Sequence, residues 1–355
     1  MAINAGLASL SESLWTAATG TYMLAVVAYT GEYAFGKNGR IARTSTDRTA
    51  QASGVRQPAL VGSSEATGGI ADRLDGMADQ PDLASQPRFG AGTVEPAGDA
   101  GRRWGRAAVG FTVLAALFHL ASVAIRGIAV DRVPWGNMYE FTLVVGLMAT
   151  VAWLATLVKM PQLRYLGLFV MMPVLLVMFL AGTLYTKASK LVPALQSYWL
   201  AIHVSSVAVA EGILLTSAAI TTMYLVRARF ERHAAAGTAP ARFAALGSRL
   251  PAAAALDKAA YRTVAFAFPI YTAGVIFGAI WAEAAWGRYW GWDPKETWAF
   301  IAWVIYAMYL HARATAGWKG NRAAYINLLG FGAMTFNFFV VNIVISGLHS
   351  YAGLS

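Results

Sequence analysis

The sequence contains no cysteine and few charged residues. Of its 355 residues, only 13% are Asp, Glu, Lys or Arg, whereas 57% are hydrophobic. Without cysteine the chain has no disulfide, no thiolate metal site and no thiol redox centre of its own. Soluble domains carry roughly 25% charged residues. A chain with about half that proportion is therefore expected to lie mostly in lipid.

Acidic residues are also scarce relative to basic ones, which gives a formal net charge of +10. In a soluble protein such a balance would suggest binding to nucleic acid. Here the Lys and Arg residues lie in short segments between apolar runs. Basic loops of membrane proteins stay on the cytoplasmic side, so the charge indicates topology, and no nucleic-acid partner is predicted.

Eight apolar runs have the length of about 20 residues that a helix needs to cross a bilayer. They predict an all-α, polytopic membrane helix bundle of about eight transmembrane helices in the plasma (inner) membrane. The first run lacks a basic leading region and a clear cleavage site, so we expect a retained anchor and no signal peptide. The predicted spans are 15–35, 107–129, 139–158, 164–186, 199–226, 264–285, 297–317 and 323–346.

Residues 36–105 differ in kind from the rest, because they are rich in Gly, Ser, Ala, Asp and Arg. Such a segment buries too little apolar surface to offset its chain entropy. We therefore predict a disordered linker, and its many arginines place it in the cytoplasm. This orientation puts both termini on the extracytoplasmic side. The predicted organisation is an anchor (1–35), a linker (36–105) and a membrane domain (106–355).

Half of the chain's 12 tryptophans lie in one short segment, residues 281–303. The simpler interpretation is an interfacial belt, since tryptophan is enriched at both membrane faces. A belt, however, does not place Trp286, Trp290 and Trp292 within seven residues of one loop. Their large, flat apolar rings favour an aromatic platform for a planar ligand, and two glycines in the loop permit tight turns.

The end of this loop carries signals for a helix start. Asp293 is predicted as the N-cap, Pro294 as the first helical residue and Glu296 as the third residue of a capping box. The platform is thus expected to be attached to a rigid helix. Arg288 and Lys295 are predicted to pair with the propionates of a porphyrin.

The segment WGRYWGWDPKETW (286–298) resembles the tryptophan-rich WWD signature of the haem-handling family. That family includes the CcsA/ResC proteins of system II cytochrome c biogenesis and the CcmC and CcmF proteins of system I. The resemblance covers about 107–355, including PWGNMYEF (134–141) and the ending GLHSY (347–351). The eight spans and this ending are most similar to the CcsA type, called CcsB in some actinobacterial naming. The first span and the linker depart from shorter family members.

The resemblance implies that the chain binds haem b, carries it across or within the membrane, and presents it at the outer face for covalent attachment to apocytochrome c. It implies a subunit of a cytochrome c synthase complex. The implied partners are a ResB/Ccs1-type membrane protein, an apocytochrome c with a Cys-x-x-Cys-His segment, and a thioredoxin-like thiol reductant.

Two of the five histidines are predicted near the depth of the tryptophan loop. His203 lies just inside the outer interface and His349 follows the last span. A neutral imidazole is a good axial ligand for haem iron, although an interfacial histidine also commonly bonds to loops. The resemblance implies that His203 and His349 are the outer haem ligands, beside Trp286, Trp290, Trp292, Asp293 and Arg288.

Two other histidines are predicted within the membrane. At 1.5 Å per residue, His311 lies about 20 Å and His119 about 17 Å from the outer face. Ionisable residues at such depth are functional candidates, and the resemblance implies that His311 is an intramembrane haem ligand. The second ligand is then either His119 or a residue of a partner protein. His233 is assigned no role.

Alternative functions remain open at this point. A membrane b-type cytochrome for quinone-linked electron transfer would need histidine pairs on facing helices at separate depths. A haem exporter would release haem without delivering it to a protein. A transporter with a tryptophan-lined gate is a third alternative, although no inverted repeat is visible.

Overall fold

The computed structural model describes residues 3–35, 99–191, 195–238, 246–315 and 317–349. These residues form eight α-helices and one 3₁₀ helix, and no strand occurs among them. The prediction of an all-α bundle is confirmed. The helices are α1 (Ala5–Phe35), α3 (Asp99–Val130), α4 (Met138–Lys159), η2 (Pro161–Leu166), α5 (Gly167–Thr183), α6 (Tyr198–Ala235), α8 (Ala253–Trp286), α9 (Pro294–Ala314) and α10 (Asn321–Ile343).

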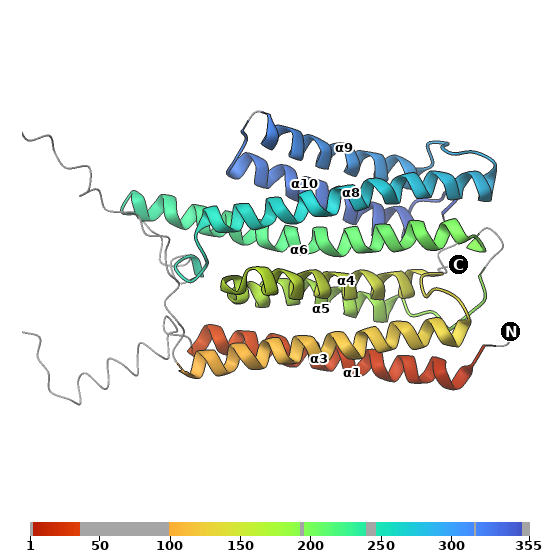
Figure 1. The fold of residues 1–355 in the computed structure, drawn as a ribbon, viewed down its shortest axis with the longest axis horizontal. Coiled ribbons are helices and arrows are strands. Elements are labelled where there is room, and N and C mark those ends of the chain that lie inside the picture. Colours follow the sequence, from red (N-terminus) through yellow and green to blue (C-terminus); the bar gives the residue numbers. More distant parts are fainter. Residues whose placement is uncertain (1–2, 36–98, 192–194, 239–245, 316, 350–355) are drawn as a thin grey trace, which may run out of the picture.

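The helices run side by side along one axis (Figure 1). α1 packs along α3 at one edge of the bundle, and α9 pairs with α10 at the other. Between them, α4 contacts both α5 and α6, and α6 packs along α8. Each predicted span overlaps one of these helices.

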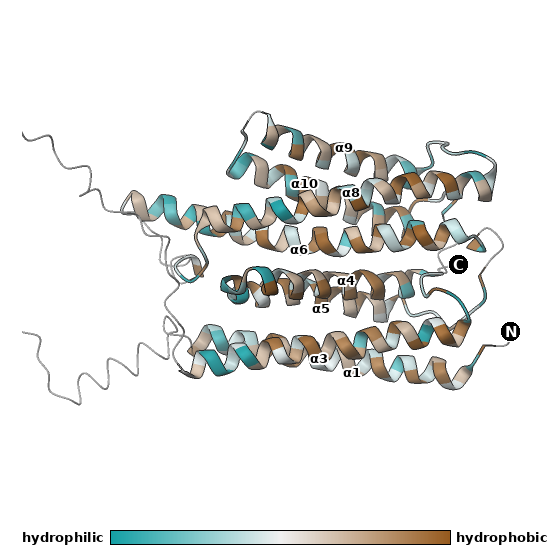
Figure 2. Ribbon diagram, viewed as in Figure 1, coloured by the Kyte–Doolittle hydropathy of each residue, from teal (hydrophilic) through white to brown (hydrophobic). Residues whose placement is uncertain are grey.

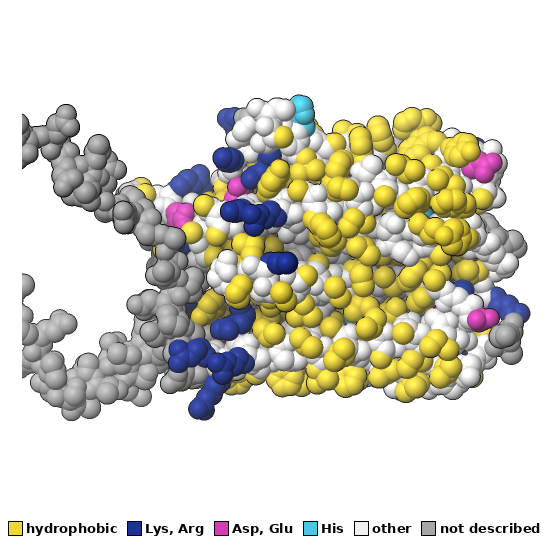
Figure 3. All heavy atoms as spheres, in the orientation of Figure 1, with side chains coloured by type: hydrophobic (Ala, Val, Ile, Leu, Met, Phe, Trp, Pro, Cys, Tyr) yellow, Lys and Arg dark blue, Asp and Glu magenta, His cyan; other side chains and the backbone are white. Residues whose placement is uncertain are grey.

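Six helices are long and apolar enough to cross a membrane, namely those spanning 100–130, 138–159, 161–183, 198–235, 253–286 and 321–343. The helices α1 and α9 are less apolar and run parallel to the other six (Figure 1). Hydrophobic side chains cover most of the visible outer surface (Figure 3). The chain is thus a membrane protein built as a helical bundle.

Two helices are longer than their apolar runs. α6 continues to Ala235 and α8 begins at Ala253, although we expected a loop from about 227 to 263. Ion pairs stabilise these polar extensions: Arg227 pairs with Glu231 one turn later, and Arg313 of α9 binds Asp257 with two contacts of 2.6 and 2.8 Å. Ion pairs between residues on different turns or helices cannot be recognised from a hydropathy pattern.

The predicted linker also ends earlier than expected. Residues 99–105, assigned to it from composition, form the first turns of α3. The side chain of Trp104 explains this start, because its ring stacks on Phe35 at the end of α1, with ring centroids 6.0 Å apart. Residues 36–98 lie outside the described part of the chain.

Hydrophilic residues gather at the end of the bundle opposite the α8–α9 loop (Figure 2). Lys and Arg side chains are concentrated at the same end (Figure 3). The start of α1 and the end of α10 lie at the same end of the bundle as the α8–α9 loop (Figure 1). This arrangement has the polarity expected from the positive-inside rule, and the side of the membrane that each end faces stays a prediction.

Candidate functional site

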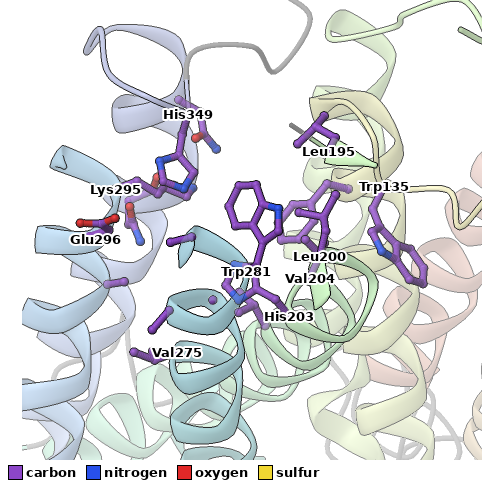
Figure 4. Close-up of a pocket in the computed structure, with 18 of the residues that line it drawn as sticks. Trp135, Leu195, Leu200, His203, Val204, Val275, Trp281, Lys295, Glu296 and His349 are labelled. Atoms are coloured by element: carbon purple, nitrogen blue, oxygen red, sulfur yellow. The ribbon is translucent and has the colours of Figure 1, made fainter. Parts of the chain in front are cut away.

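A cavity opens at the α8–α9 end of the bundle, between α4, α6, α8, α9 and the segment after α10 (Figure 4). Its volume is about 1140 Å³, part of which is open to the surroundings, and its walls are mainly apolar. Four of its lining residues were singled out in the sequence as candidate ligands or platform residues: His203, His349, Trp286 and Trp290.

His203 reaches this cavity because glycines on α8 allow α6 to approach closely. A Cβ atom at Gly278 would lie 2.7 Å from Cε1 of the His203 ring, so any larger residue there would force the ring to move. One turn earlier, the carbonyl oxygen of Gly274 lies 2.8 Å from Nδ1 of His203. Small residues commonly allow such close helix contacts in membranes.

His349 is held from the other side by the start of α9. Its Nδ1 atom lies 2.8 Å from Oδ2 of Asp293, and the backbone N–H of Leu348 donates to Oδ1 of the same carboxylate at 2.8 Å. A Cβ atom at Gly347 would lie only 2.8 Å from Asp293 Oδ1. The carboxylate thus fixes the segment after α10 against the α8–α9 loop.

The hydrogen bonds define the state of both imidazole rings. A carbonyl or carboxylate oxygen accepts hydrogen bonds, so Nδ1 must carry the hydrogen in His203 and in His349. In a neutral ring the lone pair is then on Nε2, the arrangement found in metal-binding histidines. Burial lowers the pKa of His349, against the opposing effect of Asp293, and so favours the neutral ring.

Asp293 itself stays ionised. Burial acts to raise the pKa of its carboxyl group, but hydrogen bonds from His349, Leu348 and the backbone of Lys295 outweigh this effect. The net result is a pKa of about 2. The predicted capping box is confirmed, since Asp293 caps α9 and the side chain of Glu296 reaches back to the N-cap backbone.

Trp281 lies between the two histidines (Figure 4). Its ring stacks on that of His203, with the ring centroids 6.0 Å apart and an interplanar angle of 11°. It meets the ring of His349 edge to face, with the centroids 5.7 Å apart. The ring centroid of Trp286 lies 5.1 Å from that of His349. Two imidazoles separated by 146 positions in the sequence are therefore brought to one indole cluster, as the sequence predicted.

The tryptophans of the loop do not form one flat platform. Trp286 and Trp290 line the cavity, whereas Trp292 is turned outward with 65% of its surface exposed. Its φ of 58° is in the left-handed region, which is uncommon for a residue with a Cβ atom. Trp292 contacts Trp290 and Phe300 and does not line the cavity.

Arg288 forms an ion pair within the α8–α9 loop. Its guanidinium group binds Glu296 at 3.0 Å, and that carboxylate also accepts the backbone N–H groups of Gly291 and Asp293. Arg288 therefore stabilises the loop, and it does not line the cavity. Lys295 does line the cavity, with its Nζ atom donating to the carbonyl oxygen of Asn337 at 3.1 Å.

The structure separates the other two candidate histidines. His119 is fully buried, where its Nδ1 atom lies 3.3 Å from the hydroxyl of Tyr22 on α1. His311 is exposed near the end of α9, at the opposite edge of the bundle from α3 (Figure 1). This chain therefore does not pair His119 with His311. All five histidines are described, and they form no second pair of the kind that a b-type cytochrome needs.

Trp281 was missed as a site residue in the sequence. It follows Gly274 by seven positions and Gly278 by three, so the three residues share one face of α8. The wall formed by the α3–α4 loop was also missed, where Trp135, Gly136 and Asn137 line the cavity. The capping residue Asn137 before an apolar run was the available signal.

Comparison with known proteins gives a consistent result. Residues 135–349 match the family model described as cytochrome C assembly protein. The cytochrome c biogenesis protein CcsA of Guillardia theta is 36% identical over 264 residues, covering 69% of this chain and 85% of that protein. CcsA of Synechococcus elongatus is 38% identical over 199 residues, covering 46% of this chain and 61% of that protein.

A solved structure has a similar fold. The cytochrome c heme lyase CcmF superposes with a TM-score of 0.58 at 16% sequence identity, covering 94% of this chain and 46% of that chain. This chain thus spans about half the length of CcmF, and the likeness concerns the fold alone. The family model covers more than half of the sequence and includes both histidines of the cavity and the tryptophan loop, so this chain belongs to the cytochrome c assembly protein family, within its CcsA type.

Proposed function

We propose that this chain binds haem b in the cavity, where Nε2 of His203 and of His349 would hold the iron, and presents it to an apocytochrome c. One observation carries the proposal: two neutral imidazoles from distant segments reach one apolar cavity, each with Nδ1 occupied by a protein acceptor. Neutral imidazoles held in this way are suitable haem ligands.

The residues of the cavity fit a porphyrin in other respects. Its walls offer the indoles of Trp281 and Trp286, and flat apolar rings of this kind stack well on a conjugated macrocycle. The indole Nε1 of Trp135 and the amide Nδ2 of Asn137 are buried without an acceptor, and the carboxylates of haem could accept hydrogen bonds from them.

The contribution of the chain is orientation and exclusion of water. Asp293 orients the ring of His349, Gly274 orients that of His203, and the indoles keep the walls of the cavity apolar. Haem supplies the vinyl groups to which the thiols of a Cys-x-x-Cys-His segment add. The chain has no cysteine, so in this proposal both thiols belong to the apocytochrome.

The wider setting follows from the family and the fold. We propose a plasma (inner) membrane location with the cavity on the extracytoplasmic side, and a complex with a ResB/Ccs1-type membrane protein and a thioredoxin-like reductant. The exposed position of His311 on α9 supports a partner as the source of the second intramembrane ligand. Family membership and the fold of the CcmF heme lyase support a role in cytochrome c maturation.

The axial ligands can be tested by visible spectroscopy of the purified chain. We expect His203→Gly and His349→Gly each to lose or alter the haem Soret band, and added imidazole to restore it by occupying the space of the missing ring. His233→Gly is the matched control, because His233 lies near the far end of α6 and does not line the cavity. If both cavity variants keep the wild-type spectrum, the ligand assignment is wrong.

A further inference from the structure

The α3–α4 loop presents two buried hydrogen-bond donors that have no acceptor. They are Nε1 of Trp135 and Nδ2 of Asn137, and both residues line the cavity. Asn137 is only 7% exposed. Most buried polar groups find a partner, and leaving one unsatisfied is destabilising. Two such donors beside one cavity indicate that a ligand accepts from them.

The local structure prevents the Asn137 amide from finding another acceptor by turning over. Its Oδ1 atom accepts the backbone N–H of Glu140 at 2.9 Å and so caps α4. An amide group that was flipped would place its donor nitrogen against another donor, which is unfavourable. The helix cap therefore fixes the orientation of the Asn137 amide, and Nδ2 stays on the side where it has no acceptor.

The loop itself is held rigidly by Glu140. This buried carboxylate accepts the backbone N–H of Gly136 at 2.9 Å and binds the guanidinium groups of Arg126 and Arg132 at 3.0 and 2.8 Å. Two positive charges thus share one buried negative charge directly behind the loop. A further carboxylate, that of Glu12, lies 3.8 Å from Arg126 and is 38% exposed. The buried part of this cluster consequently favours an anion.

We propose that the α3–α4 loop is the carboxylate subsite of the cavity, where Asn137 Nδ2 and Trp135 Nε1 donate to the propionates of the porphyrin. The inference rests on the proposed binding of haem. Trp135 lies across the cavity from His349 and Lys295 (Figure 4). The carboxylate edge of the ligand is then directed toward α3 and α4, away from the α8–α9 loop.

The other side of the cavity is less suited to carboxylates. Arg288 is bound to Glu296. Lys295 donates to Asn337, and its charge already interacts with the carboxylate of Glu211. Glu211 Oε2 and Asn337 Oδ1 are buried acceptors without a donor. Acceptors in this position would repel a propionate.

The test compares haemin with its dimethyl ester, in which both propionates are neutral, by Soret titration of the purified full chain. Asn137→Asp keeps an N-cap acceptor for α4 but removes the amide donor, and Trp135→Phe removes only the indole N–H and part of the ring. We expect either change to weaken haemin binding about tenfold or more and to have little effect on binding of the ester.

The control is Lys295→Met, which removes the competing cation and is expected to affect haemin and ester alike. The proposed subsite would be contradicted if both loop variants weakened binding of haemin and of the ester equally. It would also be contradicted if neither variant changed the affinity for either compound. The subsite would also be contradicted if Lys295→Met were the only variant that weakened binding of haemin without weakening binding of the ester. If Asn137→Asp does not fold, Trp135→Phe decides. A wild-type chain that binds neither compound would instead show that the proposed function is wrong.

Discussion

Asp293 combines a structural and a positioning role in one side chain. One oxygen caps α9 and accepts from His349, while the other accepts from Leu348. The start of a helix is a rigid platform, and the positive end of its dipole stabilises the carboxylate. The orientation of His349 therefore depends on where α9 begins, so a single residue links the tryptophan loop to the end of the chain.

Replacing Asp293→Asn removes the negative charge and one of the two acceptor oxygens. Asparagine caps helices about as well as aspartate, so we expect α9 to form, while the contact with His349 loses the charge of its acceptor. Loss of the carboxylate that orients a metal-binding histidine typically lowers affinity about 10- to 100-fold. Soret titration should show a haem affinity at least about tenfold lower.

The matched control is Asp257→Asn, since Asp257 binds Arg313 outside the cavity. We expect this variant to bind haem like the wild type. An Asp293→Asn variant with unchanged affinity would contradict the role assigned to the Asp293–His349 contact.

At the scale of helices, the contact between α6 and α8 determines the position of His203. The glycine face of α8 provides the space for the imidazole, and the carbonyl oxygen of Gly274 fixes its tautomer. The same face then presents Trp281 one turn later. A helix pair with bulkier residues here would keep its length and hydropathy but would have no room for the ring.

Gly278→Ala tests this packing directly. The new methyl group would lie 2.7 Å from Cε1 of His203, so the ring must move. We expect a loss of haem binding comparable to that of His203→Gly, without rescue by imidazole because the ring still occupies the space. Gly110→Ala is the control, since nothing lies within 4 Å of its Cβ position. Normal haem spectra in Gly278→Ala would contradict the packing argument.

The helices were largely predictable from the sequence, because apolar runs and capping residues are local signals. The convergence of His203 and His349 was predicted from their depth and from the family resemblance. The directions of individual side chains were not predictable. Trp292 turns outward because of its left-handed backbone, and Arg288 turns to Glu296 because that carboxylate also binds two backbone N–H groups. Both depend on the folded loop.

At the scale of the whole molecule, the bundle has two different ends. The cavity, the start of α1 and the end of α10 lie at one end, and most of the visible Lys and Arg side chains lie at the other (Figures 1 and 3). The positive-inside rule therefore predicts that the cavity faces the extracytoplasmic side.

The absence of cysteine permits a clean test of this orientation. A single cysteine introduced by Tyr289→Cys lies in the α8–α9 loop, where Tyr289 is 61% exposed. A second variant, Lys319→Cys, places the thiol at an exposed position between α9 and α10. A membrane-impermeant maleimide should label the first variant in intact cells and the second only after permeabilisation. The reverse pattern would show that the predicted topology is wrong.

The position of Trp281 has a consequence for the protein before it binds haem. Two neutral imidazoles facing a common space would also attract zinc or copper, for which nitrogen ligands have high affinity. The indole contacts both rings and separates them. A small ion therefore cannot bridge the pair while the indole stays in place. We therefore expect the protein without haem to bind zinc or copper weakly at this pair.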